Sequence, residues 1–123
     1  MAEPAVTVEG ADRVASTMHK AARMLGDLTE QNKDAAAIFT AVARQRAPRL
    51  TGALAAATMP AWDKENAGFT NPLPYFGPIH YGWPAHDIEP NPYVDQAVDE
   101  TERDWLAVYE KATADAAGQV KGA

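Results

Sequence analysis

The sequence contains no cysteine, so disulfide bridges, thiolate metal ligands and cysteine nucleophiles are all excluded. It also has no apolar run near the roughly 20 residues that a helix needs to cross a bilayer. The first ten residues, MAEPAVTVEG, have neither the basic region nor the apolar region of a signal peptide. We therefore expect a soluble protein, made inside a cell and without a membrane partner, that forms one domain over its 123 residues.

Residues for covalent catalysis are also scarce. The single serine, Ser16, lies in an expected helix and has no glycine elbow around it. Thr51 has no base placed beside it by the sequence, and there is no glycine-rich phosphate loop. The sequence therefore predicts no enzyme and no cofactor, with one metal-dependent alternative described below.

The net charge of −6 is unevenly distributed. Residues 1–60 carry six acids and seven bases, whereas residues 61–123 carry eleven acids and four bases. A general nucleic-acid binder would be basic overall. The asymmetry suits head-to-tail contact between copies of the chain, although two solvated faces would give the same pattern.

Residues 11–47 are expected to be helical. A first helix over Ala11–Leu25 would place an apolar stripe on one face, formed by Val14, Met18, Ala22 and Leu25. A second helix would run from Thr29 or Gln31 to Gln45. Pro48 must end it, because proline lacks the amide donor and disfavours helical geometry in the residue before it.

Residues 51–82 are expected to be rich in β-structure. Gly52–Trp62 and Ala67–Asn71 are predicted as the two arms of a hairpin around the polar turn DKENAG. A third strand is predicted from Gly77 or Pro78 to Tyr81. These predictions depend on the turn signals, because alanine is a weak β-former.

Residues 91–116 are predicted to form the last helix, with Pro92 at its first position. Its apolar stripe follows at spacings of three and four: Val94, Val98, Thr101, Trp105, Val108 and Ala112. Both termini are expected to fray. The expected fold is α+β, with a small, mostly antiparallel sheet packed against two N-terminal helices and a long C-terminal helix.

Two groups of residues raise functional alternatives. His80 and His86, with Asp87 beside them, leave open a small metal-dependent hydrolase, although their spacing matches no standard ligand set. The cluster Arg44, Arg46 and Arg49 leaves three readings open. It can contact DNA, oppose the negative end of the second helix, or pair with the acidic helix of a neighbouring copy.

Three motifs in a fixed order carry a resemblance to a known family. RAPRLTGAL joins a helix to a strand, YFGPIHYG is rich in tyrosine and glycine, and PNPYVDQA opens the last helix. Together they resemble the neck or tail-completion (head–tail connector) proteins of long-tailed bacteriophages with non-contractile tails. The matching positions are Pro48, Thr51, Gly52 and Leu54, then Tyr75, Ile79, Tyr81 and Gly82, then Pro90, Pro92, Tyr93, Val94 and Ala97.

The sequence also departs from the family pattern. Leu50 stands where an arginine is usual, Phe76 and Gly77 replace small residues, and His80 stands where a glutamate is common. The resemblance implies a structural virion protein at the head–tail junction, assembled in the host cytoplasm. It implies a homo-oligomeric ring, six-fold by analogy, that joins the tail to the head connector. Head closure, tail completion and tail termination all stay open.

The expected partners are further copies of the chain, the head-completion or connector proteins, and the tail tube or tail terminator protein. Contact with genome DNA in the channel is a further expectation. Tyr75 and Tyr81 should share one face of the predicted third strand, with His80 on the other at a subunit contact. The predicted interface residues are Arg44, Arg46, Arg49, Asp63, Lys64, Glu65, Tyr75, His80 and Trp83.

Overall fold

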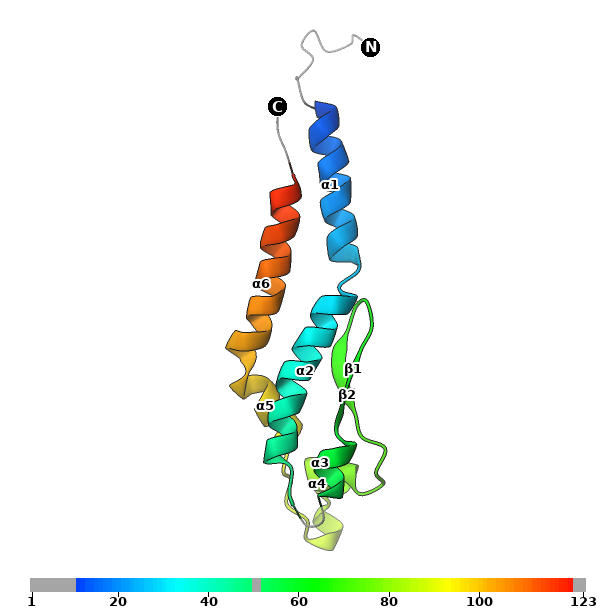
Figure 1. The fold of residues 1–123 in the computed structure, drawn as a ribbon. Helices are drawn as coiled ribbons and strands as arrows, with labels where there is room; N and C mark the ends of the chain where they lie inside the picture. The colour runs from blue at the N-terminus through cyan, green and yellow to red at the C-terminus, as the bar shows by residue number, and fades with distance from the viewer. Residues whose placement is uncertain (1–10, 50–51, 121–123) are drawn as a thin grey trace.

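The second helix is the element on which the others pack. The computed structural model describes residues 11–49 and 52–120. Helix α2 (Thr29–Arg46) contacts a two-stranded sheet on one side and the C-terminal helices on another. Figure 1 shows α2 between them in an elongated molecule. The remaining elements are α1 (Ala11–Gly26), α3 (Ala53–Ala57), β1 (Met59–Trp62), β2 (Ala67–Thr70), α4 (Phe76–Tyr81), a 3₁₀ turn η1 (Pro84–His86), α5 (Tyr93–Glu100) and α6 (Glu102–Gln119).

The predicted α+β class is confirmed. Strands β1 and β2 pair antiparallel, in a register that sets Met59 against Thr70 and Trp62 against Ala67. Two N-terminal helices precede this sheet and a long C-terminal helix follows it. The structure is more helical than expected, because two segments predicted as strand are helices.

The first of these segments is residues 53–57, predicted as part of the first hairpin arm. Gly52 adopts φ 79°, a left-handed conformation, and α3 follows with the sequence ALAAA. Alanine has the highest helix propensity and is a weak β-former, which favours a helical turn over an extended strand at this position. Only Met59–Trp62 of the predicted arm is a strand. The second arm, predicted as Ala67–Asn71, is confirmed as Ala67–Thr70.

The second segment is the predicted third strand, which is wrong. Residues 76–81 form α4, with Pro78 in the first turn, where a missing amide hydrogen breaks no helical bond. A helix brings His80 into the interior, where it is fully buried. The prediction that Tyr75 and Tyr81 share one face of a strand, with His80 on the other face, is therefore wrong.

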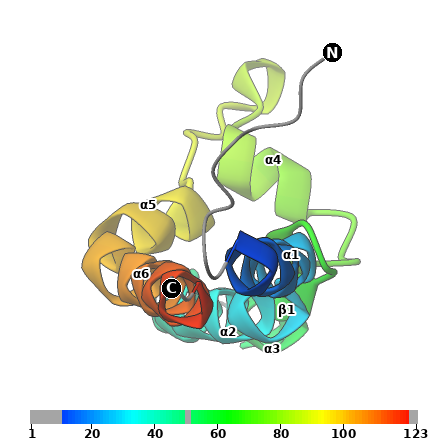
Figure 2. The same cartoon turned by 90° about the horizontal axis from the view of Figure 1, so that it is seen from above.

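Helix α1 lies beside α6 (Figures 1 and 2), but its packed face differs from the predicted stripe. Ala21 is the buried residue of α1, while Met18, Ala22 and Leu25 are exposed. The packed face is thus shifted by about one residue. The apolar residues of the predicted stripe, Val14 excepted, face away from the protein interior.

The predicted last helix is divided at Thr101 into α5 and α6. The Thr101 hydroxyl donates to the Ala97 carbonyl (2.7 Å), and the Trp105 indole donates to the Val98 carbonyl (2.9 Å). Side chains that bond these carbonyls explain the bend between α5 and α6. Helix α5 begins at Tyr93, so Pro92 precedes the first helical residue, and α6 continues three residues beyond the predicted end at 116.

The core lies where α2, α3 and α5 meet. Its buried apolar side chains are Ala43, Ala47, Leu54, Tyr93, Val94 and Ala97. The expected fraying of the chain ends concerns mainly residues 1–10 and 121–123, which lie outside the described residues, as does Thr51. None of the described helices is both long enough and apolar enough to cross a membrane.

A buried amide links three distant elements. The Asn32 amide nitrogen donates to the Asp63 carbonyl (2.9 Å), and the Tyr109 hydroxyl donates to the Asn32 side-chain oxygen (2.6 Å). The Leu28 amide also donates to the Lys64 carbonyl (3.1 Å). These bonds join the hairpin turn to α2 and α2 to α6.

We predict that Tyr109→Phe lowers the free energy of unfolding by about 1–2 kcal/mol, because it leaves the buried Asn32 oxygen without a donor. Urea denaturation measures the change. Tyr81→Phe is the matched control, since the same hydroxyl is removed from an exposed ring and should change stability by less than about 0.5 kcal/mol. Equal effects of the two substitutions would contradict this role for Asn32.

Gly82 adopts φ 83° and ψ 163°, a region open almost only to glycine. A Cβ there would also lie 3.1 Å from the Pro90 ring and 3.2 Å from the Ile88 carbonyl. We predict that Gly82→Ala destabilises the fold by at least about 1–3 kcal/mol. Gly77→Ala, whose Cβ would meet nothing within 4 Å, should leave the thermal midpoint nearly unchanged. Similar melting curves for the two variants would refute the strain at Gly82.

Candidate protein-interaction surface

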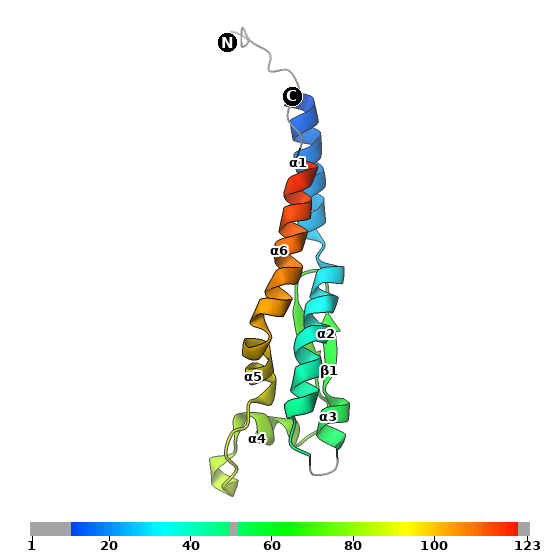
Figure 3. The same ribbon diagram turned by 60° about the vertical axis from the view of Figure 1, so that its left-hand side comes forward.

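An apolar groove of about 740 Å³ opens at the end of the molecule that carries α3 and α4. Figure 3 shows α3 and α4 gathered at this end. Two aromatic rings in its lining are strongly exposed, Tyr75 at 42% and Trp83 at 45%. We call this the aromatic groove; its lining is Pro48, Leu54, Pro74, Tyr75, Pro78, Ile79, Trp83 and Ile88.

Prolines and glycines shape the aromatic groove. Pro48 follows the end of α2, and the left-handed Gly52 starts α3 and lets Leu54 turn inward. Gly82 then redirects the chain from α4 to Trp83. The Trp83 amide donates to the Ile88 carbonyl (2.9 Å) and the Ile88 amide donates back (3.1 Å), which closes the loop around η1.

The first two family-like motifs line this groove, and the third packs behind them in the core. Leu54 of the first motif and Ile79 of the second both line it. The Asn91 amide of the third motif donates to the Ile79 carbonyl (2.9 Å). Tyr93 of the third motif packs in the same core cluster as Leu54, with Ile79 against it. Segments that are far apart in the sequence therefore build one end of the molecule.

The three arginines of the predicted interface have different environments. Arg46 bonds Glu100 of its own chain (2.6 Å) and reaches Gln96 (3.5 Å). Arg46 therefore pairs with an acidic helix of its own copy. Both partners are about half exposed, so the pair adds at most about 1 kcal/mol to stability.

Arg44 and Arg49 are exposed and line a shallow depression of about 320 Å³, together with Gly52, Ala55 and Ala56. Neither arginine forms an ion pair within the described part of the chain. Leu54 of the aromatic groove lies between Gly52 and Ala55 in the sequence, and Pro48 adjoins Arg49. The apolar groove and the cationic depression are therefore neighbours.

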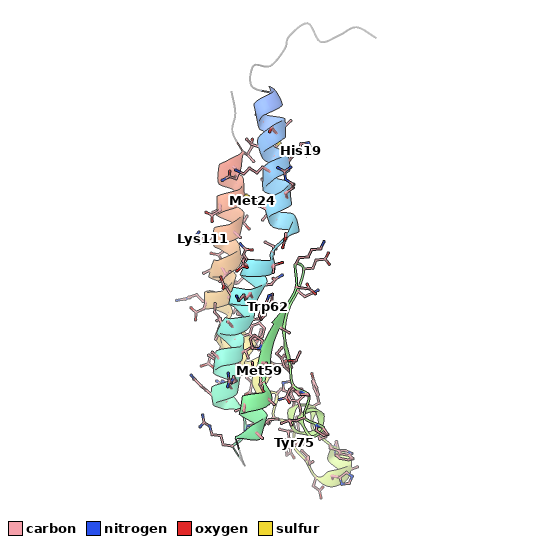
Figure 4. All side chains as sticks on the ribbon, turned by 45° about the vertical axis from the view of Figure 1, so that its right-hand side comes forward. His19, Met24, Met59, Trp62, Tyr75 and Lys111 are labelled. Atoms are coloured by element: carbon pink, nitrogen blue, oxygen red, sulfur yellow. The ribbon has the colours of Figure 1, made fainter. Side chains whose placement is uncertain are left out.

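The predicted interface residues of the hairpin turn lie away from this groove. Figure 4 shows the hairpin extending from the end near Tyr75 and Met59, past Trp62, to its turn near the start of α2. Asp63 accepts bonds from the amides of Glu65 (2.8 Å) and Asn66 (2.7 Å), which hold its pKa below the usual value. Lys64 and Glu65 are exposed. The structure thus divides the predicted interface residues between two regions.

His80 is not available for a subunit contact, which corrects the prediction from sequence. It is 0% exposed, and neither ring nitrogen has a hydrogen-bond partner in the structure as described. Its ring stacks on Phe76 (centroids 5.0 Å apart) and lies edge-on to Tyr93 (5.6 Å). Burial lowers the pKa of His80, and the nearby carboxylate of Asp95 partly opposes this shift.

The residues of the metal alternative are dispersed. His86 is exposed and packs on Trp83, with ring centroids 3.8 Å apart, whereas His80 lies inside the aromatic cluster. Within residues 11–49 and 52–120, no group of three histidines, aspartates or glutamates is placed to hold a metal ion.

A second concavity of about 500 Å³ lies between the hairpin and helices α5 and α6. It includes Asn32 and Tyr109, which bond each other, and Trp105, which bonds a helix carbonyl. These polar groups are already used by the fold. The aromatic groove, whose exposed rings lack such ties, is the stronger candidate for binding.

The sequence pointed to Tyr75 and Trp83 but not to Ile79 and Ile88, which line the same groove. The sequence signal that points to this groove is the high density of proline and aromatic residues over positions 71–84. Comparison with protein-family models, curated proteins and solved structures finds no match for this chain.

The buried His80 predicts a pH dependence of stability. In the unfolded chain this ring binds a proton near pH 6.5. In the folded chain it binds a proton only at a lower pH, because burial disfavours the charged ring. The free energy of unfolding should therefore fall as pH drops below about 6.5, and level off once pH passes below the lowered pKa of the folded state.

Urea denaturation at several pH values between 8 and 5 measures this dependence. His80→Phe keeps an aromatic ring beside Phe76 and removes the titrating group. In this variant, part of the decrease in the free energy of unfolding below pH 6.5 should therefore disappear. The exposed histidines His19 and His86 are retained in both proteins, and their contributions cancel in the comparison. Parallel pH profiles for the two proteins would contradict the prediction.

Proposed function

We propose that this chain is a structural protein of a tailed bacteriophage virion. It acts at the head–tail interface as a neck, tail-completion or tail-terminator protein. Copies of the chain form a ring, six-fold by analogy with the family it resembles, and this ring joins the tail to the head connector. The proposal begins from the three ordered motifs of the sequence.

The observation that carries the proposal is that the first two motifs line the aromatic groove while the third packs against them from the core. Leu54 and Ile79 line it together, and Asn91 bonds the Ile79 backbone. Large exposed aromatic residues such as Tyr75 and Trp83 are common anchors of protein interfaces. The motif segments therefore support a docking role that requires no reacting atom.

The distribution of exposed residues supports a contact between unlike surfaces. The groove is at the end that carries α3 and α4, whereas α1, which exposes Met18 and Leu25, lies towards the other end (Figure 1). A contact in which one patch meets a different patch on the next copy generates a ring when the rotation closes. The hairpin turn, with exposed Lys64 and Glu65, is left free for a head-side or tail-side partner.

We predict that the chain is found in purified virions and that cryo-electron microscopy places it in the neck as a closed ring. In solution, light scattering behind size-exclusion chromatography should show assembly that rises with protein concentration. Trp83→Ala should weaken this assembly without unfolding the chain, because the indole ring is about half exposed.

Trp62→Ala is the matched control for Trp83→Ala, because it removes the same exposed side chain (41%) from β1, outside both the aromatic groove and the cationic depression. Absence of the chain from virions would overturn the proposed location. A chain that stays monomeric at high concentration and also in the presence of connector and tail proteins would overturn the ring.

A further inference from the structure

The end of the molecule with the aromatic groove carries two unused binding features. Tyr75 and Trp83 expose apolar surface, and beside them Arg44 and Arg49 have no ion-pair partner among the described residues. An occupant that fits presents an apolar side chain with acidic groups beside it. An acidic helix with a single exposed leucine or phenylalanine has this chemistry.

Helix α6 of a second copy has these properties. Leu106 is the large apolar side chain exposed within α6, at 37%. Glu102 and Glu110 lie one turn before it and one turn after it on the same face, since residues four apart are neighbours on a helix. Neither glutamate forms an ion pair in the residues that the structure describes.

Charge distinguishes α6 from the other exposed apolar helix. The α6 sequence carries four acids (Glu102, Asp104, Glu110, Asp115) and two bases. The α1 sequence, which exposes Met18 and Leu25, carries one acid and three bases. A surface with Arg44 and Arg49 attracts the first helix and repels the second, and this complementarity selects the partner surface.

We propose that α6 of one copy docks in the aromatic groove of the next copy, with Leu106 between Tyr75 and Trp83. Glu102 and Glu110 then meet Arg44 and Arg49. The inference rests on the proposed ring and specifies its contact. Within one chain α6 extends away from the groove (Figure 3), so the docked helix belongs to another copy.

Engineered cysteines test this contact without background, because the chain has none of its own. Two single variants, Tyr75→Cys and Leu106→Cys, are mixed and oxidised at a concentration where the chain assembles. A disulfide should form between the two variants in the mixture and in neither variant alone. Lys111→Cys is the control, since it is exposed on α6 but faces about 140° away from Leu106.

The alternatives give distinct outcomes. Coupling of the groove cysteine to Met18→Cys in place of Leu106→Cys would assign the groove to α1 and overturn the proposal. Rings that form while Tyr75→Cys couples to neither helix would overturn the docked contact and leave the ring intact. A disulfide from Leu106→Cys alone would show two α6 helices facing each other, which also overturns the contact.

The double variant Tyr75→Cys/Leu106→Cys separates this inference from the proposed function. A ring should give a ladder of covalent oligomers that ends at the number of subunits. A ladder that stops at the dimer would support the α6 contact but overturn the ring, because two copies would then exchange helices around a two-fold axis.

Charge reversal tests the electrostatic part. Arg44→Glu/Arg49→Glu should weaken self-association about tenfold, and Glu102→Lys/Glu110→Lys should do the same. Combining all four substitutions should restore association, because the complementary signs return. Lys20→Glu/Arg23→Glu, an equal reversal on α1, should have little effect, and an equal loss there would overturn the assignment.

Discussion

The buried contact between Thr58 and Tyr93 holds together the part of the structure on which the candidate surface depends. Both side chains are fully buried, and their hydroxyl oxygens lie 2.9 Å apart. The Thr58 hydroxyl also bonds the Leu54 carbonyl (2.8 Å), and the Asn71 amide nitrogen approaches it at 3.0 Å. A buried hydroxyl without a hydrogen-bond partner costs roughly 1–3 kcal/mol. The hydroxyls of Thr58 and Tyr93 therefore have their partners only when α3, the hairpin and α5 are all in place.

Packing holds α4 against this network without hydrogen bonds from its buried histidine. Phe76 contacts Phe69 and Tyr93 edge-on, at centroid distances of 5.5 and 6.0 Å, and His80 fills the space between these rings. Pro74 and Pro78 restrict the backbone on the outer side of the same segment. The groove is therefore lined by side chains on a stiff backbone, which reduces the entropy that a docked partner would have to remove.

The sequence predicted the helix ends and turns that are determined by residues close together in the chain. The ends of α1 and α2, the stop at Pro48 and the second hairpin arm follow from periodicity and from turn residues. Helix α4 could not be predicted in this way, because its six residues are too few to show a helical period. Its conformation is set by the burial of His80 against Phe69 of β2 and Tyr93 of α5.

The candidate surface was predictable only in part, for a related reason. Tyr75 and Trp83 stand out by residue type, whereas the groove also needs Pro48, Leu54 and Ile88 from separate segments. Arg46 looked equivalent to Arg44 and Arg49, but it pairs with Glu100, which lies 54 positions away in the sequence. No spacing rule connects residues at such a distance, so only the folded chain separates the used arginine from the unused ones.

The error in the α1 stripe has a different origin. The sequence has a clear apolar period at Met18, Ala22 and Leu25, yet the folded chain packs Ala21 inward and leaves that stripe exposed. An amphipathic period indicates that a face is covered, but it does not say whether the cover comes from the same chain. Leu106 of α6 and the aromatic groove are the exposed apolar surfaces that the proposed contact between copies would cover.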